Sequence, residues 1–206
     1  MSNVSPSGPP MAASPLTRAV LEIDEYASGL GWDQPARLFA LVDTAQLRAQ
    51  EPGLAAQLGL DEPDAPDAPD APGGGGGPGG PRGAHAPAPL TPVEQDEIPS
   101  GIPLDEFLGT IAWPDAVAGC ALTVERLMLP PSAETSVPEG LDEAGLAEWV
   151  AAHPDRQEVR MTVAVLRDGA RESALRLREK DSATEVLTGA ELVPGLAEAL
   201  SATFEA

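Results

Sequence analysis

The sequence has one cysteine, one lysine and two histidines among its 206 residues, and aromatic residues make up only 3% of it. A single cysteine, Cys120, cannot form a disulfide within the chain, which agrees with a reducing compartment. The N-terminus lacks the basic and apolar regions of a secretion signal, and no apolar run approaches the roughly 20 residues that span a bilayer. We therefore expect a cytoplasmic protein with no membrane association.

The charge of the chain is strongly one-sided. The sequence contains 33 acidic and 12 basic residues, for a net charge of −21, and the acidic excess extends along the whole chain. Binding to nucleic acids or to anionic membrane surfaces depends largely on lysine and arginine. We therefore expect no nucleic-acid partner and no membrane partner.

Proline, glycine and aspartate dominate the middle of the chain, where there is little apolar surface to bury. Pro-Asp-Ala repeats are followed by five glycines at 73–77 and by a Pro/Ala tract. Such a segment cannot recover its ordering entropy through burial. We predict disorder in residues 1–12 and in an insert at 61–100, and one α+β domain from 13–60 and 101–206. The insert is either a tolerated loop, which we favour, or a tether for a partner.

Helical and strand patterns alternate on both sides of the insert. Proline after Ser14 predicts a helix start, and apolar residues recur at helical spacing as far as Leu30, with Glu22, Asp24 and Glu25 outside the apolar stripe. Further patterns predict a strand at 37–42, short helices within 44–60, a helix at 104–108, a strand at 118–129, a helix at 141–150, a hairpin at 159–180 and a C-terminal helix from 192. This order favours a single, mostly antiparallel sheet with helices packed on one face.

Residues 159–180 alternate between apolar and polar side chains around Asp168-Gly169, which is typical of a β-hairpin. A three-residue loop from Asp168 to Ala170 keeps one face of the hairpin apolar, whereas a two-residue loop mixes the faces. The predicted register pairs Val163 with Leu175, Met161 with Leu177, Thr162 with Arg176, and Arg160 with Arg178.

The sequence shows no recognisable catalytic or metal-binding constellation. The candidates for a nucleophilic or ligand-binding site are Trp113, Asp115, Cys120 and His153. Cys120 is expected to face inward beside Leu122 and Val124, where cysteine usually acts as a small apolar residue. His153 precedes a proline at a helix end, and a lone histidine in a turn is a weak metal ligand. We expect no enzyme activity, no cofactor and no metal.

Arginine side chains gather on the hairpin face opposite the predicted core. Arg160, Arg176 and Arg178 project from it together with Thr162. Because like charges across a strand pair repel each other, Arg160 opposite Arg178 requires an anionic neighbour. Glu125 on the preceding strand supplies it in the favoured interpretation, and an acidic surface of a second subunit or partner supplies it in the other. These four residues are the candidate partner-binding face.

Three long stretches of the sequence resemble one known family. They are residues 113–126 (WPDAVAGCALTVER), 153–160 (HPDRQEVR) and 192–196 (LVPGL). They are similar to the uncharacterised PPA-type conserved family of actinobacteria, over the chain apart from the insert and the extreme N-terminus. This resemblance implies no assigned reaction. The order of elements also resembles that of type III secretion chaperone-like proteins, which implies a small acidic dimer that binds polypeptides.

The leading functional hypothesis is a non-enzymatic, cytoplasmic, partner-binding protein, chaperone-like or an adaptor, that associates with a second copy or with another protein. Its rival is a small-ligand binder or enzyme centred on Trp113, Asp115, Cys120 and His153. A third hypothesis is a structural accessory domain with no ligand.

Overall fold

The computed structural model describes residues 13–60, 88–99 and 101–205. The disorder predicted for residues 1–12, and for residues 61–87 of the insert, falls outside these ranges.

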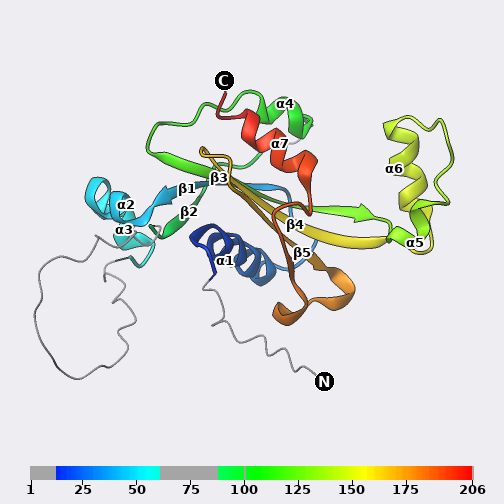
Figure 1. Ribbon diagram of the computed structural model, residues 1–206, viewed down its shortest axis with the longest axis horizontal. Coiled ribbons are helices and arrows are strands. Elements are labelled where there is room, and N and C mark those ends of the chain that lie inside the picture. Colours follow the sequence, from blue (N-terminus) through cyan, green and yellow to red (C-terminus); the bar gives the residue numbers. More distant parts are fainter. Residues whose placement is uncertain (1–12, 61–87, 100, 206) are drawn as a thin grey trace, which may run out of the picture.

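The described residues form one six-stranded antiparallel sheet (Figure 1). Its strand order is β2-β1-β3-β4-β5-β6, so the two longest strands, β3 and β4, lie in the middle. The strands are β1 (Arg37–Asp43), β2 (Leu90–Glu94), β3 (Val117–Met128), β4 (Gln157–Leu166), β5 (Arg171–Leu177) and β6 (Leu187–Thr188). The predicted α+β class with a single antiparallel sheet is confirmed.

Seven α-helices and two short 3₁₀ helices accompany the described part of the sheet. Ser14 caps the first helix by accepting a hydrogen bond from the Thr17 amide, as the Ser-Pro start predicts. The α-helices are α1 (Pro15–Gly29), α2 (Thr44–Gln50), α3 (Pro52–Gln57), α4 (Leu104–Leu108), α5 (Pro131–Glu134), α6 (Glu143–Ala152) and α7 (Pro194–Ala202). The 3₁₀ helices are η1 (Arg178–Lys180) and η2 (Ala183–Glu185).

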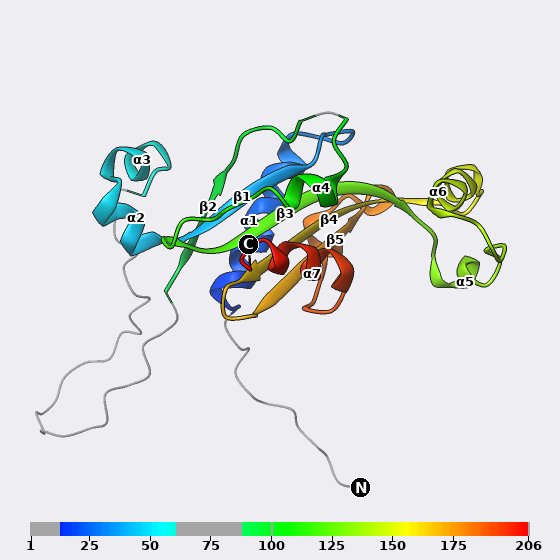
Figure 2. The same cartoon turned by 90° about the horizontal axis from the view of Figure 1, so that it is seen from above.

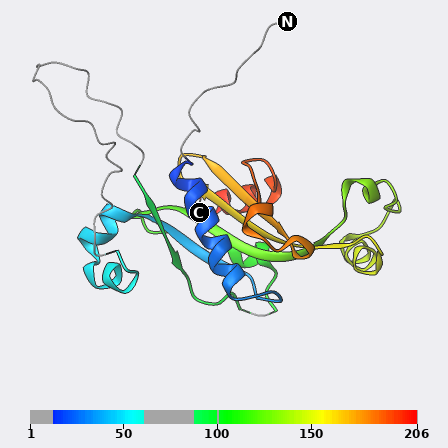
Figure 3. The same cartoon turned by 90° about the horizontal axis from the view of Figure 1, so that it is seen from below.

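Helices cover both faces of the sheet, which corrects the expectation that they pack on one face. Helix α1 lies across one face and contacts β2 to β5, while α7 lies on the other face against β3 and β4 (Figure 3). The α1 face carries small residues on the inner strands, including Ala121, Ala164 and Ala174. Small side chains allow a helix to approach a sheet closely. Helix α1 therefore packs on this face, although the sequence pattern predicted a polar, uncovered face.

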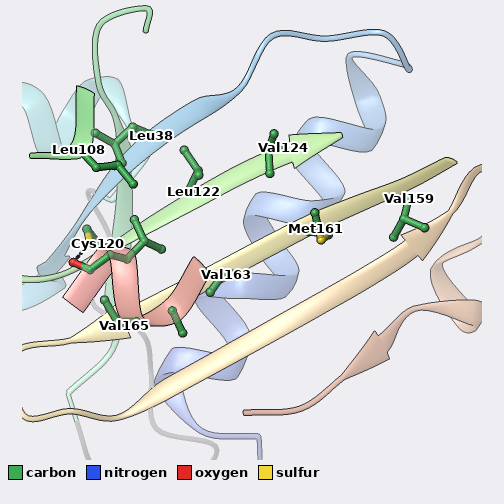
Figure 4. Close-up of a cluster of buried hydrophobic side chains, with 11 residues drawn as sticks. Leu38, Leu108, Cys120, Leu122, Val124, Val159, Met161, Val163 and Val165 are labelled. Carbon is green, nitrogen blue, oxygen red and sulfur yellow. Dashed lines mark hydrogen bonds between the residues drawn. The ribbon is translucent and has the colours of Figure 1, made fainter. Parts of the chain in front are cut away.

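The larger apolar cluster lies under α7 (Figure 4). Cys120, Leu122 and Val124 project from β3 into it, as the alternation predicts, and meet Leu200 of α7. Leu175 and Leu177 of the hairpin pack against the same cluster. The apolar face of the hairpin is therefore the face predicted from the sequence.

The predicted hairpin register is wrong by two residues. Val163 pairs with Ser173 instead of Leu175, and Arg160 pairs with Arg176 instead of Arg178. The loop is Arg167 to Gly169, closed by the Leu166 amide donating to the Ala170 carbonyl at 2.8 Å. A shift of two residues leaves every side chain on its original face, so the apolar pattern does not select between the two registers.

The predicted insert ends too late in the chain. Residues 88–99 are part of the described structure and include β2, whose strand pattern is obscured by Pro92. Proline cannot donate to a sheet ladder, and it is tolerated in β2 because this strand lies at the edge of the sheet.

The two central strands extend beyond the rest of the sheet. The last β1 residue paired with β3 is Arg37, opposite Thr123, yet β3 continues in register with β4 as far as Met128, opposite Gln157. This two-stranded ribbon carries α5 and α6, which stand away from the body of the molecule (Figure 2). We call residues 129–156, between the ends of β3 and β4, the distal lobe.

Candidate functional site

Three of the four residues predicted to form a partner-binding face are buried beneath α1. The exposed fractions of Arg160, Thr162 and Arg176 are 1%, 0% and 4%. Arg178 is exposed, and it lies in η1 just past the end of β5. The face is therefore covered by the protein's own first helix, and these three side chains are not accessible to a partner in this structure.

Arg176 is neutralised by a carboxylate of α1. Its Nη2 lies 2.5 Å from Asp24 Oδ2 and its Nε donates to the same oxygen at 3.1 Å, while its Nη1 donates to Asp181 Oδ1 at 3.2 Å. Asp24 is itself buried, which corrects the prediction that it lies outside the apolar stripe of the helix. A buried charge is tolerated only when it is paired in this way.

Arg160 is paired within the chain, as the favoured interpretation predicted. Its Nη2 and Nε donate to Glu125 Oε1 at 2.8 and 3.2 Å, and Nη2 also donates to the Gly31 carbonyl. Thr162 donates to Thr123 Oγ1 on the neighbouring strand at 3.1 Å. The charge of Arg160 and the hydroxyl of Thr162 are thus paired within the chain.

Trp32, in the connection between α1 and β1, lies against two of the arginines. The guanidinium of Arg160 is 4.4 Å from the Trp32 ring centroid and that of Arg178 is 5.6 Å away. The indole Nε1–H donates to Asp181 at 2.8 Å. Stacking of this kind stabilises a cation that is partly removed from water.

Asp33 completes the group of charges. Its carboxylate accepts two hydrogen bonds from Arg178, both 3.0 Å, and its amide donates to Glu125 at 2.7 Å. It has a φ of 66°, a conformation that aspartate adopts more readily than most residues. The hydrogen bonds from Arg178 lower the pKa of Asp33, and the bond from Trp32, followed by that from Arg176, lowers the pKa of Asp181.

These residues form one connected group, which we call the Trp32 cluster. It ties α1 and the loop after it to β3, β4 and β5, and its arrangement is structural. Trp32, Asp24 and Asp181 were not among the site residues predicted from the sequence. One signal was available for Asp24, which follows Val20 by four residues and precedes Ala27 by three, and therefore lies on the buried side of the helix. The cluster consists of Asp24, Trp32, Asp33, Glu125, Arg160, Arg176, Arg178 and Asp181.

A small cavity adjoins the cluster under the end of α1. It is lined in part by Arg37, Thr123 and Arg160 and has a volume of about 10 Å³. Among the described residues, Arg37 Nε and Arg160 Nη1 have no hydrogen-bond partner. A cavity of this size accommodates about one water molecule, so it cannot hold an organic ligand.

A larger hollow, of about 300 Å³, lies between α1 and β2. No histidine or cysteine lines it, so it offers neither a thiol nor an imidazole. The Tyr26 hydroxyl donates to Glu94 at 2.7 Å at its edge. Partial burial and the nearby Glu25 raise the pKa of Glu22. The lining residues are Glu22, Ile23, Tyr26, Phe39, Leu58, Pro92 and Glu94.

The alternative site centred on Cys120 and His153 is not assembled. Cys120 is fully buried, with its sulfur 3.8 Å from Thr203 Oγ1, and Trp113 Nε1–H donates to the same hydroxyl at 2.9 Å. Burial raises the pKa of Cys120 to about 12. Asp115 is exposed in the turn before β3.

His153 lies at the end of α6, in the distal lobe. Its ring centroid is 4.8 Å from that of Trp149, and its Nδ1 accepts a hydrogen bond from the Asp155 amide. The strand from Cys120 to Met128 separates the lobe from the thiol by roughly 26 Å, at about 3.3 Å per residue. A nucleophile and its base must meet at hydrogen-bond distance, so these two residues do not form a catalytic pair.

Among the described residues, no three His, Cys, Asp or Glu side chains are grouped in a way that could hold a metal ion. His85 and the glycines at 73–77 lie outside those residues. Within the described ranges, no helix has the length and apolarity needed to cross a membrane.

The distal lobe and the adjoining end of β3 carry exposed apolar side chains. Leu127 and Met128 at the end of β3 are 39% and 38% exposed, and Leu141 and Leu146 in and before α6 are 41% and 39% exposed. Trp149 is half-buried against His153. The predicted helix at 141–150 is confirmed as α6, but its predicted apolar side does not enter the core.

The lobe has almost no apolar core of its own. Among its side chains whose exposure is described, only Ala133 is buried, and α6 contributes none. Asp142 caps α6 by accepting a hydrogen bond from the Gly145 amide at 2.8 Å. Isolated helices shorter than about 12 residues are marginal in water, so a ten-residue helix with no buried face gains little from this position.

Comparisons with known proteins place the chain in a family. No curated protein and no solved structure matches it. The resemblance to type III secretion chaperone-like proteins therefore has no support. A family model described as "PPA1309-like protein" matches residues 16–205, which is nearly the whole chain and includes the three stretches singled out in the sequence. The chain belongs to the PPA1309-like protein family.

Proposed function

We propose that this protein is a non-enzymatic, cytoplasmic binding module that holds another polypeptide against its distal lobe. The observation that carries the proposal is the group of exposed apolar side chains, Leu127, Met128, Leu141 and Leu146, at the end of a ribbon that projects from the body. Contiguous patches of exposed apolar side chains often mark interaction sites, whereas single scattered ones are common on any protein surface.

The position of these side chains supports docking. β1 pairs with β3 only as far as Thr123 and β5 with β4 only as far as Val159, which is opposite Arg126. Beyond that pair β3 and β4 pair only with each other, and the lobe lies past their ends. A chain under selection for stability alone gains nothing from such an extension. A partner covering α6 would supply the burial that the lobe lacks.

The remaining features fit a binding role. Cys120 is buried, His153 lies in the lobe, and the candidate catalytic residues do not meet. The Trp32 cluster joins α1 to the sheet within the body, and the lobe projects from that body. A body with a projecting docking element suits an adaptor.

Photo-crosslinking in the native cell tests the proposal. A photoreactive residue replaces Leu146 in one variant and Leu192 in a matched control, since both leucines are 39% exposed and Leu192 belongs to the body. We expect adducts with another polypeptide from the Leu146 position and none from the Leu192 position. Equal labelling from both positions, or none from Leu146, would show that the lobe is not the docking element.

A second measurement uses the side chain itself. Leu146→Ser should weaken co-purification of the crosslinked partner at least about tenfold, which corresponds to roughly 1.4 kcal/mol. Leu192→Ser is the control and should leave co-purification unchanged. Both variants replace an exposed leucine, so both should keep the stability of the native protein.

A further inference from the structure

We infer that the segment bound by the distal lobe is a cationic, amphipathic stretch of a different protein. This inference rests on the proposed function and adds the chemistry of the partner. It follows from the acidic residues near the exposed apolar side chains and from the classes of partner that those acidic residues would repel.

The distal lobe is acidic throughout. Residues 129–156 contain six acidic residues and one basic residue, Arg156, which lies at the junction with β4. Glu139, Asp142 and Glu148 are exposed on α6 and on the loop before it. The exposed leucines of the lobe, Leu141 and Leu146, therefore lie in a segment with a strong excess of negative charge.

Three kinds of occupant are disfavoured by this charge. Nucleic acids and anionic membrane surfaces carry phosphate and would be repelled. A second copy of the chain has a net charge of −21 and an equally acidic lobe, so a lobe-to-lobe contact would bring like charges together. Arg160 and Arg176 of the Trp32 cluster are buried, and the exposed Arg178 is already paired with Asp33 and Glu158, so the cluster offers a second copy no unpaired basic surface.

A basic segment with an apolar stripe satisfies both features of the lobe. Its apolar side chains would cover Leu127, Met128 and Leu146, while its lysines and arginines would lie near Glu139 and Glu148. Amphipathic segments bind apolar grooves and helix faces through side chains at helical spacing, and opposite charge raises the association rate and sets the orientation. Docking would also stabilise α6, which has no buried face in the free chain.

Direct binding of designed peptides tests this chemistry on the full-length protein. The probe is a helical Lys/Leu peptide of about 18 residues, five turns, with leucines on one face. Two control peptides of equal length separate the contributions: a Lys/Ser peptide of the same charge has no apolar stripe, and a Glu/Leu peptide has the stripe with the opposite charge. We expect the Lys/Leu peptide to bind at least about tenfold more tightly than either control, a difference of roughly 1.4 kcal/mol.

Two sets of charge variants locate the binding site. The triple variant Glu139→Gln, Asp142→Asn, Glu148→Gln should weaken binding of the Lys/Leu peptide at least about fivefold, since it removes three of the charges that would attract the lysines. Asn at position 142 keeps the helix cap. The matched control is Asp105→Asn, Glu106→Gln, Glu198→Gln, which removes the same charge from exposed positions of the body. It should change the affinity less than about twofold, and Leu146→Ser should weaken binding as much as the lobe triple variant.

The outcomes separate this inference from the proposed function. Equal loss in both triple variants, or equal binding of the Lys/Ser peptide, would mean attraction to overall negative charge and would overturn the inference. The crosslinked partner peptide from position 146 gives an independent reading. A segment rich in lysine and arginine with apolar residues three or four apart supports it, while an acidic or uncharged segment, or a second copy of this chain, overturns it and leaves lobe docking intact. Absence of lobe crosslinks removes the proposed function itself.

Discussion

Arg176 of β5 and Asp24 of α1 form an ion pair with three hydrogen bonds, in which both side chains are almost entirely buried. The pair joins the first helix to the fifth strand across 152 positions of sequence. Removing Asp24 leaves the buried Arg176 with only the partly exposed Asp181 as a charged partner. We expect Asp24→Ala to lower the free energy of unfolding by about 3–5 kcal/mol.

Urea denaturation followed by circular dichroism measures this loss. The control is Glu25→Ala, the adjacent exposed acid, which should change stability by less than about 0.5 kcal/mol. The double variant Asp24→Leu, Arg176→Met should lose less than Asp24→Ala, because it leaves no buried charge. The single variants Asp24→Leu and Arg176→Met complete the comparison. A loss of unfolding free energy in the double variant equal to the sum of the two single losses would contradict a direct pairing.

Trp32 stabilises the fold through its ring and through its N–H group. We expect Trp32→Ala to cost about 2 kcal/mol, because it removes stacking on Arg160 together with the hydrogen bond to Asp181. Trp32→Phe keeps a ring over Arg160 and should cost about half as much. Equal losses for the two variants in thermal or urea denaturation would show that stacking contributes nothing.

The stability of the protein should fall at acidic pH. Both Asp33 and Asp181 have a pKa below the ordinary value of 3.8, Asp33 through its hydrogen bonds to Arg178 and Asp181 through Trp32 and then Arg176. A carboxylate whose pKa is lowered by folding stabilises the native state fully above its unfolded pKa and loses that contribution as pH falls through the folded pKa. The contribution should therefore disappear as the pH drops below about 4.

Denaturation midpoints across this pH range measure the effect. Arg178→Gln removes the main cause of the shift at Asp33 and should flatten the pH dependence. Arg171→Gln is the matched control, since its partner Glu191 is an exposed acid at 3.3 Å. An unchanged slope in Arg178→Gln would contradict the role of Arg178.

Cys120 should be unreactive in the folded protein. It is fully buried, and burial raises the pKa of its thiol to about 12, so almost no thiolate forms near neutral pH. We expect no labelling by iodoacetamide at pH 8 until denaturant unfolds the chain, as followed by mass spectrometry. Fast labelling under native conditions would show that the cluster under α7 opens readily.

Deletion of the distal lobe should leave the body folded. Met128 and Gln157 are register partners, so a two-residue Asn-Gly turn can join them after removal of residues 129–156. Because Ala133 is the only buried residue among the described side chains of the lobe, the free energy of unfolding should change by less than about 1 kcal/mol. A body that fails to fold without the lobe would mean that the ribbon end is structural.

Secondary structure was largely predictable, because the relevant signals are local. The Ser14-Pro15 start, the alternation in β3 and the Asp168-Gly169 turn each depend on neighbouring residues, and the structure has α1, β3 and the hairpin where these signals place them. β2 was missed because a proline interrupts its pattern, and only its position at the sheet edge makes that proline acceptable.

The candidate site was predictable only in part. The pairing of Arg160 with Glu125 followed from charge on neighbouring strands. The burial of Arg176 did not, because its partner Asp24 is 152 positions away and the covering helix is placed by packing on small alanines. The exposure of α6 could not be predicted either, because an apolar helix face in a sequence is ordinarily assigned to the core.

The sequence alone determined the acidity of the chain, its α+β class and most of its helices and strands, because composition and periodicity are properties of short segments. Tertiary structure decided the rest. It placed α1 over the arginine face, selected one of two hairpin registers that bury the same side chains, and held α6 away from the core at the end of a ribbon. Each of these depends on contacts between residues distant in the chain, and no local pattern records which distant surfaces meet.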